Sequence, residues 1–525
     1  MRVTLSEIAA VLGLCHADIL WGTVRLQKGG EEYRRPSGLT DNGADPAVTV
    51  DDRVLLDMPW SGEFPKGGQV DSRLVKEGDL FFCIKGERVD GHDFAGIAAR
   101  AGACAIVAGR DPFAGERADV EQAKSLPPVF LVPDVVRALQ RLALCHRNTC
   151  MSKVVGITGT AGKTSVKEVL AHVLAVRGQT ERNPLNKNNG IGLPLSMINA
   201  SAYASYWVME AGISQPHDMD ELGDILRPDV AIVLNVGNAH AEGLGDKGVA
   251  HYKAKLLEYV QPSGVGFYSA DYPELEQAVS SILPQLEHRG LELLRFSANP
   301  ASAENGVYCR AVYEGATERG SGRFRVSVDK FERQVEAPFR GEMGSENVAA
   351  IFAAATKLGL TFDEILRGLS TAVLPDQRFS PSQKGKFVIV DDSYNANPLS
   401  SRRMLDAVEE MAREAKLPLI LVMGEMGELG HGAEVAHFML GQHMASVRPA
   451  VVFWKGGWAK TVLRGLEQGG YTGALYEISG PDDFGECMSD SALREGLVLF
   501  KGSRMNRLEE LVRSFSENCA EQKDF

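Results

Sequence analysis

The chain has 525 residues, too many for a single hydrophobic core, so we expect about three domains. Its 44% hydrophobic and 24% charged residues are ordinary for a soluble globular protein, and its formal net charge of −13 disfavours nucleic acid as a bulk partner. No apolar run approaches the ~20 residues that span a bilayer, and the first residues lack a signal-peptide pattern, so we expect a cytoplasmic chain without membrane insertion.

The first segment, residues 1–147, is predicted to form a small α/β domain. Apolar runs indicate three strands, at residues 79–84, 104–108 and 129–132. The run at 90–94 leads into an alanine-rich helix. Residues 22–68 are rich in glycine, proline and charged side chains, so we interpret them as long loops or an insertion.

The second segment, residues 148–374, opens with the most informative stretch of the chain. An apolar run at 154–157 breaks into a glycine-rich loop that opens a helix at Lys163. The N–H groups of such a loop attract phosphates, while Lys163 can bridge the outer phosphates and Thr164 can offer its hydroxyl to Mg²⁺. The loop is a variant, because strict Walker spacing would put glycine at Ile157. The alternative is a turn whose glycines serve geometry only.

Polar residues follow two later strands of this segment. Apolar runs predict these strands at residues 206–209 and 230–234. Glu210 follows the first and could bind Mg²⁺ directly or through water, although a lone strand-end glutamate is more often a cap or a surface charge. His240, beyond the second strand, is ambiguous alone, but its joint placement with Glu210 favours a functional site. Lys255, taken alone, is a helix-surface lysine.

The third segment, residues 375–525, repeats this pattern. Apolar runs predict strands at residues 387–390, 419–423, 451–454 and 497–500. Each run ends on polar residues, and ligands of open α/β sheets bind beyond the carboxyl ends of the strands. We therefore expect an α/β protein in which a small first domain precedes a central P-loop ATPase-like parallel sheet and a Rossmann-like C-terminal domain.

Two further features of the composition bear on ligands. The eight cysteines are scattered without a CxxC pair, which indicates reduced thiols rather than a disulfide framework or a zinc site. Because the chain is acidic, any anionic substrate must be held by local devices such as helix N-termini, Mg²⁺ and individual basic side chains.

The central motifs resemble those of the Mur ligases, the ATP-dependent amide-forming enzymes of peptidoglycan synthesis. The resemblance rests on the loop at 156–165, on Glu210, and on residues 238–243 followed by Lys255. Further runs resemble the member that adds D-alanyl-D-alanine to a UDP-N-acetylmuramoyl tripeptide, and they lie at residues 186–195, 391–398, 423–430 and 501–504. In that member the Asp-Asp-Ser-Tyr-Asn-Ala-Asn-Pro run at 391–398 replaces a Tyr-Ala-His-type motif of the tripeptide-forming ligase.

The resemblance implies a reaction and a distribution of ligands. The UDP moiety would bind the first domain, ATP and two Mg²⁺ the central domain, and D-Ala-D-Ala with part of the ATP the third. The tripeptide carboxylate would attack the γ-phosphate, and the dipeptide amine would then displace phosphate from the acyl phosphate. Two unit negative charges at ~4 Å repel by about 4 kcal/mol at an effective dielectric near 20, so metal and lysine charges are required.

The resemblance also assigns roles to individual residues. Lys163 and Thr164 would hold the β/γ-phosphates and one Mg²⁺, with Glu210 completing that ion's shell. His240 and Lys255 match a second metal site, in which the family lysine is carbamylated. The other residues that match nucleotide contacts are Gly159, Thr160, Ala161, Gly162, Ser165, Asn347, Arg378, Asp392 and Asn395. The residues that match substrate contacts are Ser72, Arg73, Lys85, Asn186, Asn188, Asn189, Asn397 and Lys501.

Three departures from the family pattern stand out. Where the family usually shows His-Asn-x-x-Asn near adenine, this chain keeps only Asn347, with Glu346 before it and Ala350 after it. Glu425 stands where aspartate is usual, and the loop at 182–185 lacks the usual threonine. We interpret these changes as divergence within one activity, with altered nucleotide preference as the alternative.

Other functions remain open at this stage. One is another amide ligase of the superfamily, either the tripeptide-forming or a folylpolyglutamate-type enzyme, and the run at 391–398 argues against both. Another is a phosphate-loop switch without a covalent product, for which the polar strand ends are more than is required. We expect a monomer, while the third tripeptide residue, meso-diaminopimelate or lysine, and the extent of domain closure stay open.

Overall fold

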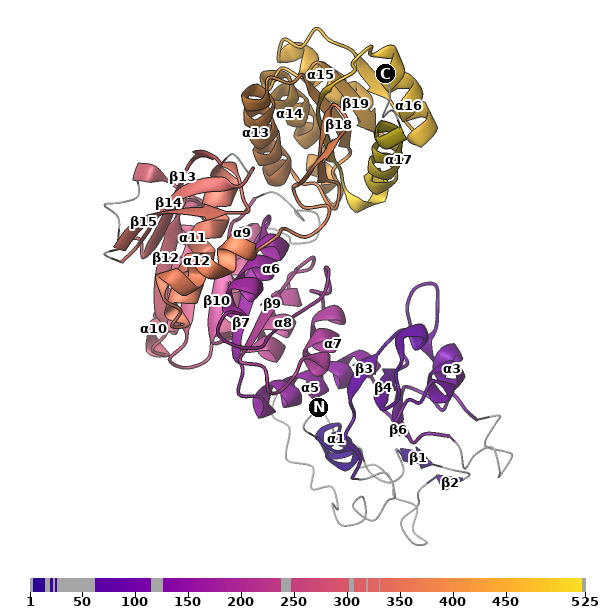
Figure 1. Cartoon of the computed structure of the whole chain (residues 1–525). Coiled ribbons are helices and arrows are strands. Elements are labelled where there is room, and N and C mark those ends of the chain that lie inside the picture. The colour runs from indigo at the N-terminus through magenta and orange to yellow at the C-terminus, as the bar shows by residue number, and fades with distance from the viewer. Residues whose placement is uncertain are drawn as a thin grey trace. The chain divides into compact units, whose positions relative to one another are not determined.

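A computed structural model describes most of the chain (Figure 1). The described residues are 3–14, 19–21, 24–25, 62–114, 126–237, 247–301, 306–317, 320–329 and 331–521. The chain divides into two compact units, the first made of residues 1–154, 181–209 and 221–227, and the second of residues 155–180, 210–220 and 228–525. None of the helices in the described ranges combines the length and apolar character that a bilayer-spanning segment needs.

The first sheet has six strands in the order β2-β1-β6-β5-β4-β3. Its strands are β1 (Ile19–Trp21), β2 (Val24–Arg25), β3 (Gly67–Gln69), β4 (Asp79–Phe82), β5 (Ala105–Ala108) and β6 (Val129–Leu131). Strands β3 to β6 run parallel, and β1 is antiparallel to both of its neighbours. The helices of this part are α1 (Leu5–Val11), η2 (Ser72–Leu74), η3 (Gly91–Phe94), α3 (Ala95–Arg100) and α5 (Val135–Thr149). The three predicted strands and the alanine-rich helix are confirmed.

Most of residues 22–68, interpreted as long loops or an insertion, lies outside the described residues, but strands β2 and the start of β3 lie near its two ends where loops were expected. Strand β3 was not predicted, because its two glycines weaken the apolar pattern that indicates a strand. A Cβ on Gly67 would lie 2.3 Å from Asn199 Oδ1 and one on Gly68 would lie 2.5 Å from Ile198 Cδ1, so either would force these side chains to shift. Both contacts come from α7 (Gly192–Asn199), which packs on β3.

The largest sheet has nine strands in the order β15-β14-β13-β12-β11-β10-β7-β9-β8. They are β7 (Lys153–Thr158), β8 (Thr180–Arg182), β9 (Tyr206–Glu210), β10 (Val230–Val233), β11 (Val265–Ser269), β12 (Glu292–Ser297), β13 (Cys309–Ala316), β14 (Gly322–Val328) and β15 (Phe331–Ala337). Strands β7, β10, β11 and β12 are parallel, as predicted for the central domain, whereas β13 to β15 form an antiparallel extension that we did not predict.

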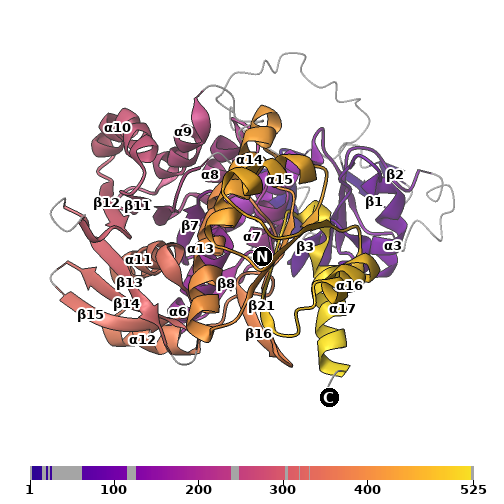
Figure 2. The same ribbon diagram turned by 90° about the horizontal axis from the view of Figure 1, so that it is seen from above.

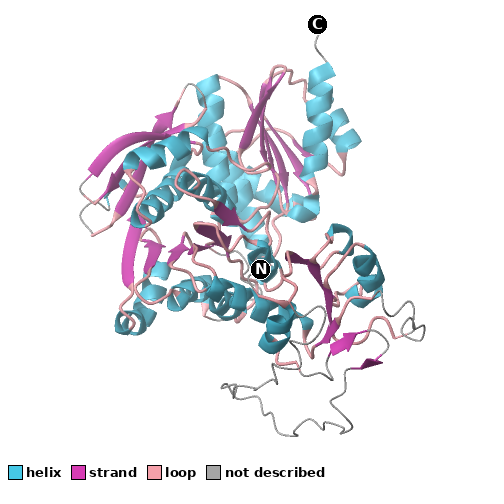
Figure 3. Cartoon of the chain, turned by 60° about the horizontal axis from the view of Figure 1, so that its bottom comes forward, coloured by secondary structure: helices cyan, strands magenta, loops and turns pink. Residues whose placement is uncertain are grey.

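Several helices within the described residues connect the strands of this sheet or follow it. They are α6 (Lys163–Leu174), α7, α8 (Asp218–Leu226), α9 (Gly248–Ala254), η5 (Lys255–Tyr259), α10 (Pro273–His288), α11 (Gly341–Lys357) and α12 (Phe362–Thr371). The apolar face predicted after Lys163 is buried, and it packs on α11 and α12. The helices and strands of these layers are distinguished in Figure 3.

The third sheet has six strands in the order β16-β17-β21-β18-β19-β20. They are β16 (Ser380–Lys384), β17 (Phe387–Asp392), β18 (Leu419–Gly424), β19 (Val451–Lys455), β20 (Leu475–Glu477) and β21 (Gly496–Lys501). All neighbours are parallel except β16 and β17. The helices are α13 (Pro398–Ala415), η7 (Gly430–Gly432), α14 (Ala433–Ser446), α15 (Ala459–Gln468), α16 (Pro481–Asp490), η8 (Arg504–Asn506) and α17 (Leu508–Glu521).

Apolar side chains of this third sheet fill a core on each face. Leu421 and Leu499 pack with α13, α14 and α15, whereas Ile420 and Phe453 pack with α16 and α17. Figure 2 shows these two groups of helices on opposite sides of the strands. Two covered faces and parallel strands make this part doubly wound, which confirms the Rossmann-like prediction.

The cysteines of the described ranges are free thiols, and several are buried. Burial raises the pKa of Cys83 and of Cys104 to about 12, so both stay protonated near neutral pH. Within the described ranges no cluster of three histidine, cysteine or acidic side chains could hold a metal ion. Cys83, Cys150, Cys309 and Cys519 are buried.

Candidate active site

The phosphate loop lies between β7 and α6 and is held by a buried asparagine. Asn235 Oδ1 accepts hydrogen bonds from Thr160 N at 3.0 Å and Ala161 N at 2.7 Å, and its Nδ2 donates to Ala161 O at 3.0 Å. Gly162 begins the helix at a φ of +83°, and a Cβ there would lie 2.6 Å from Asn347 Oδ1. Only glycine fits that position without strain. The predicted loop residues thus form one compact turn.

Two lysines converge on one carbonyl of this loop. Lys163 Nζ donates to Gly159 O at 2.8 Å, and Lys253 Nζ, from α9, donates to the same oxygen at 3.0 Å. Lys253 is only 1% exposed. Burial lowers the pKa of both amines, and the charge of Lys163 lowers that of Lys253 further. Both amines therefore lie beside the loop that would bind an anionic phosphate. Lys253 was not predicted, because in the sequence it looks like an ordinary helix lysine.

Thr164 and Glu210 provide oxygen atoms beside the loop. Thr164 Oγ1 donates to Glu210 Oε2 at 2.8 Å, and Arg378 Nη2 donates to Thr164 Oγ1 at 3.3 Å. Glu210 is 2% exposed. A hydroxyl, a buried carboxylate and nearby phosphates are the ligands that Mg²⁺ prefers, with water filling the remaining positions. The predicted first magnesium site is therefore chemically sound in this geometry.

Residues of the run at 391–398 make two different kinds of contact in the structure. Asn397 caps α13, accepting from Ser400 N at 2.9 Å, and its Nδ2 donates to Thr160 O of the phosphate loop at 3.4 Å. Asp392 instead accepts from Lys501 Nζ at 2.5 Å, and Lys501 is 1% exposed. Lys501 also donates to the carbonyl of Asn395 at 3.0 Å. The structure thus brings Asn397 to the loop and places Lys501 in a buried ion pair.

Asn347 faces the same loop. Its side chain is fully buried and its amide has no hydrogen-bond partner among the described residues. A buried amide without partners costs free energy, so a position of this kind is typical of a ligand contact. Its neighbour Glu346 is also fully buried and pairs with Arg403 at 2.8 Å. Arg378 stacks over the Tyr394 ring, with its guanidinium carbon 4.1 Å from the ring centroid.

The predicted second metal site is only partly described. His240 lies outside the described residues. Lys255 Nζ donates to Asp220 Oδ1 at 2.6 Å, and Tyr259 OH donates to the same oxygen at 2.8 Å. In this arrangement Lys255 is a cation paired with a carboxylate, so its part in a metal site stays a prediction.

The predicted substrate contacts of the first unit lie on short local structures. Arg73 forms two parallel hydrogen bonds with Asp71, Nε to Oδ1 at 2.9 Å and Nη2 to Oδ2 at 2.6 Å, on η2 beside the buried Ser72. Lys85 is exposed. Asn189 Oδ1 accepts from Ile191 N at 3.2 Å and from Gly192 N at 2.8 Å, in the turn before α7. Asn186 is exposed and Asn188 is half-buried in the same turn.

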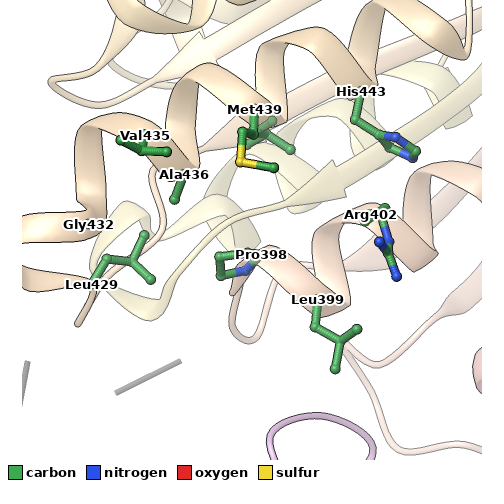
Figure 4. Close-up of a pocket in the computed structure, with 10 residues that line it drawn as sticks. Pro398, Leu399, Arg402, Leu429, Gly432, Val435, Ala436, Met439 and His443 are labelled. Carbon is green, nitrogen blue, oxygen red and sulfur yellow. The ribbon is translucent and has the colours of Figure 1, made fainter. Parts of the chain in front are cut away.

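A cavity of about 580 Å³ opens in the third domain between α13 and α14. Figure 4 shows Arg402 and His443 at one end of it, with apolar side chains along the rest. The apolar lining includes Leu399, Leu429 and Met439. His443 Nε2 lies 2.7 Å from Asp406 Oδ1. The cavity starts at Pro398, the residue after Asn397, and it was not predicted because its walls come from separate segments.

Three family models match successive parts of the chain. The Mur ligase family catalytic domain matches residues 66–147, the Mur ligase middle domain matches 157–355, and the Mur ligase glutamate ligase domain matches 377–504. The three matches fall on the three sheets of the structure. These matches confirm the three-domain α/β arrangement that the sequence predicts.

Named relatives match over most of their length. The UDP-N-acetylmuramoyl-tripeptide–D-alanyl-D-alanine ligase of Treponema pallidum is 32% identical, covering 85% of this chain and 94% of the relative. The Escherichia coli enzyme of the same name is 30% identical, covering 85% and 93%. The crystal structure of MurF ligase from Thermotoga maritima in complex with ADP has a TM-score of 0.71 at 27% identity, covering 87% of this chain and 98% of that chain.

Proposed function

The chain belongs to the Mur ligase family, and we propose that it joins D-alanyl-D-alanine to a UDP-N-acetylmuramoyl tripeptide at the expense of ATP. The observation that carries this proposal is the contact of Asn397 with Thr160 O at 3.4 Å. It joins the run that is typical of this ligase subtype to the phosphate loop. The relatives that match the chain carry the name of the same reaction.

The phosphate loop would bind ATP, with Lys163 as its main cation. With ATP bound, Lys163 would exchange the Gly159 carbonyl for the outer phosphates, because a phosphate is a stronger acceptor than a neutral carbonyl. Lys253 stays on that carbonyl, so the loop keeps one hydrogen bond when Lys163 moves. The positive charge also shields the tripeptide carboxylate from the γ-phosphate that it attacks.

Thr164 and Glu210 would hold Mg²⁺, which neutralises charge on the outer phosphates when bound. Arg378, stacked on Tyr394, is directed to Thr164 and adds a fixed cation at this edge. The dipeptide amine then attacks the acyl phosphate, and phosphate leaves. Asn397, at the start of α13, is placed to orient groups next to the loop.

Phosphate release and product mass test the proposal together. The chain is incubated with ATP, Mg²⁺, D-Ala-D-Ala and a UDP-muramoyl tripeptide that ends in either meso-diaminopimelate or lysine. We expect phosphate release only with both substrates present, and a pentapeptide product with one tripeptide or with both. Extension of the dipeptide precursor by one amino acid would assign the tripeptide-forming reaction instead. Phosphate release without any acceptor would indicate a nucleotide-binding switch.

Several finer features belong to this proposal. The second metal site would use His240 and a carbamylated Lys255. The enzyme would act as a monomer in the cytoplasm, with domain boundaries near residues 147 and 374. These features follow from the sequence reasoning and stay predictions.

A further inference from the structure

Glu346 is a buried acid next to the phosphate loop. It lies on α11, and its side chain is fully buried. A carboxylate out of water is stable only with charge and hydrogen-bond partners. Its Oε2 accepts from Arg403 Nη1 at 2.8 Å and from Asn235 Nδ2 at 2.9 Å. Burial raises the pKa of Glu346, and the charge of Arg403 opposes that shift. The acid is held between one cation and one amide.

Asn235 transmits this contact to the loop. A carboxylate only accepts hydrogen bonds, so Glu346, together with the carbonyl of Ala161, selects the Nδ2 edge of Asn235 and turns its Oδ1 toward the loop. That oxygen accepts from the N–H groups of Thr160 and Ala161. The orientation of two loop amides therefore depends on the acid behind Asn235.

Arg403 connects the acid to α13. Its side chain is 6% exposed, and its Nη2 donates to Tyr272 OH at 2.5 Å. The same helix begins after Asn397, whose Nδ2 donates to Thr160 O at 3.4 Å. Helix α13 thus reaches the phosphate loop directly at its start and, further along, through Glu346 and Asn235.

We propose that the Glu346–Arg403 pair positions groups for the reaction. It holds the phosphate loop and the start of α13 in a fixed arrangement relative to each other. The pair acts through Asn235 and Asn397, so both members are positioning residues. The nucleotide contacts of the loop and the contacts of Asn397 then form in one preorganised geometry. The kinetic readout of this inference rests on the proposed function, whereas its nucleotide-binding readout does not.

A structural role alone makes a different prediction from a positioning role. Removing only Arg403 leaves the acid buried and unpaired, which destabilises the fold in either case. Replacing both members with methionine removes the buried charges and fills a similar volume, so stability recovers. In that double variant Asn235 Nδ2 loses Glu346 and keeps only Ala161 O as an acceptor. Only a positioning role leaves nucleotide binding impaired after stability has recovered.

The experiment compares Arg403→Met, Arg403→Lys and the double variant Glu346→Met/Arg403→Met in the full chain. The readouts are the unfolding temperature, the Kd for ADP with Mg²⁺ by calorimetry, and the kcat and KM for ATP. The control is Lys357→Met, at the last residue of the same helix α11, which breaks a partly exposed pair with Glu292 of β12, Nζ to Oε1 2.6 Å. The control is expected to leave the Kd and KM unchanged.

We expect Arg403→Met to lower the unfolding temperature and raise the Kd for ADP. The double variant regains the unfolding temperature while its Kd and KM stay raised by about tenfold, a size typical of lost supporting contacts. Arg403→Lys, which keeps the charge, recovers part of the binding. A double variant with the wild-type Kd and KM would overturn the inference. If the wild-type chain makes no pentapeptide but the double variant still binds ADP weakly, the proposed function fails and the positioning role stands.

Discussion

Lys163 begins the helix that follows β7 and its loop, and Lys501 is the last residue of β21, but the two lysines have partners of different charge. Lys163 donates to the neutral carbonyl of Gly159, and Lys253 shares that acceptor. Lys501 donates to the carboxylate of Asp392 and is itself fully covered. A lysine on a carbonyl keeps its positive charge available for an anion, whereas a lysine on a buried carboxylate is neutralised. The first arrangement is suited to phosphate binding, and the second is suited to holding a strand end together.

This difference changes the roles that we expect for the two lysines. Both lysines lie beside glycines in motifs that match the family, so the sequence treats them alike. Asp392 also accepts from Phe379 N at 3.1 Å, which ties β16 to β17. We therefore expect Lys501 to matter mainly for stability, and Lys163 mainly for catalysis.

Replacing Lys501 tests the largest effect. Lys501→Met leaves Asp392 buried without its cation, which should cost about 3–5 kcal/mol of unfolding free energy. Denaturant unfolding at neutral pH measures this loss. The double variant Lys501→Met/Asp392→Asn removes both charges and is the matched control, expected to recover much of the stability. Full stability with complete loss of activity in the single variant would restore Lys501 to a direct substrate role.

Replacing Lys163 should have the reverse profile. Lys163→Ala removes the main cation for the γ-phosphate, and such a transition-state contact typically contributes ~3–4 kcal/mol, or roughly 10²–10³ in rate. Stability should change little, because Gly159 O keeps its bond to Lys253. Phosphate release and thermal unfolding separate the two effects. A stability loss equal to that of Lys501→Met would show that the neutral carbonyl needs both lysines.

Local pattern accounts for what the sequence predicted well. The strand, loop and helix around Lys163 are consecutive, and the parallel strands are short apolar runs, so each could be recognised alone. The strand β16 has the polar sequence Ser-Pro-Ser-Gln-Lys, which carries no strand signal, and it forms by pairing with β17. The sequence of β14, Gly-Arg-Phe-Arg-Val-Ser-Val, alternates polar and apolar residues from Arg323 on, which is a strand signal that we did not use.

Long-range contacts account for what the sequence could not give. The hydrogen bond between Asn235 and Glu346 joins residues 111 positions apart, and that between Lys253 and Gly159 joins residues 94 apart. No spacing rule links such positions in a single sequence. Glu346 was visible only as a departure from the family pattern, and the structure supplies its reason in the buried Arg403.

Lys255 provides an intermediate case, because its partner is a carboxylate but its side chain is 22% exposed. An ammonium paired with Asp220 would repel Mg²⁺, whereas a carbamate formed from the neutral amine and CO₂ would bind it. If Lys255 is carbamylated, Lys255→Ala loses most of its activity and regains part of it with added acetate, while Lys255→Arg is not rescued. Near wild-type turnover of Lys255→Ala without acetate would leave Lys255 as a surface partner of Asp220.

Arg73 gives the smallest expected effect on stability and tests the comparison at an exposed pair. Its side chain is 84% exposed, and solvent screens a pair of this kind, so Arg73→Ala should barely change the unfolding temperature at neutral pH. Its hydrogen bonds hold the pKa of Asp71 at about 2, below the usual value of about 4. A lowered carboxyl pKa adds stability only above the unfolded value, so the small difference between variant and wild type should stay constant down to about pH 4 and disappear toward about pH 2. Denaturant unfolding at a series of pH values measures that difference.

The KM for the UDP-muramoyl substrate separates the two roles of Arg73. A clear rise in KM at unchanged stability marks a substrate contact, and an unchanged KM leaves Arg73 as the surface partner of Asp71 alone.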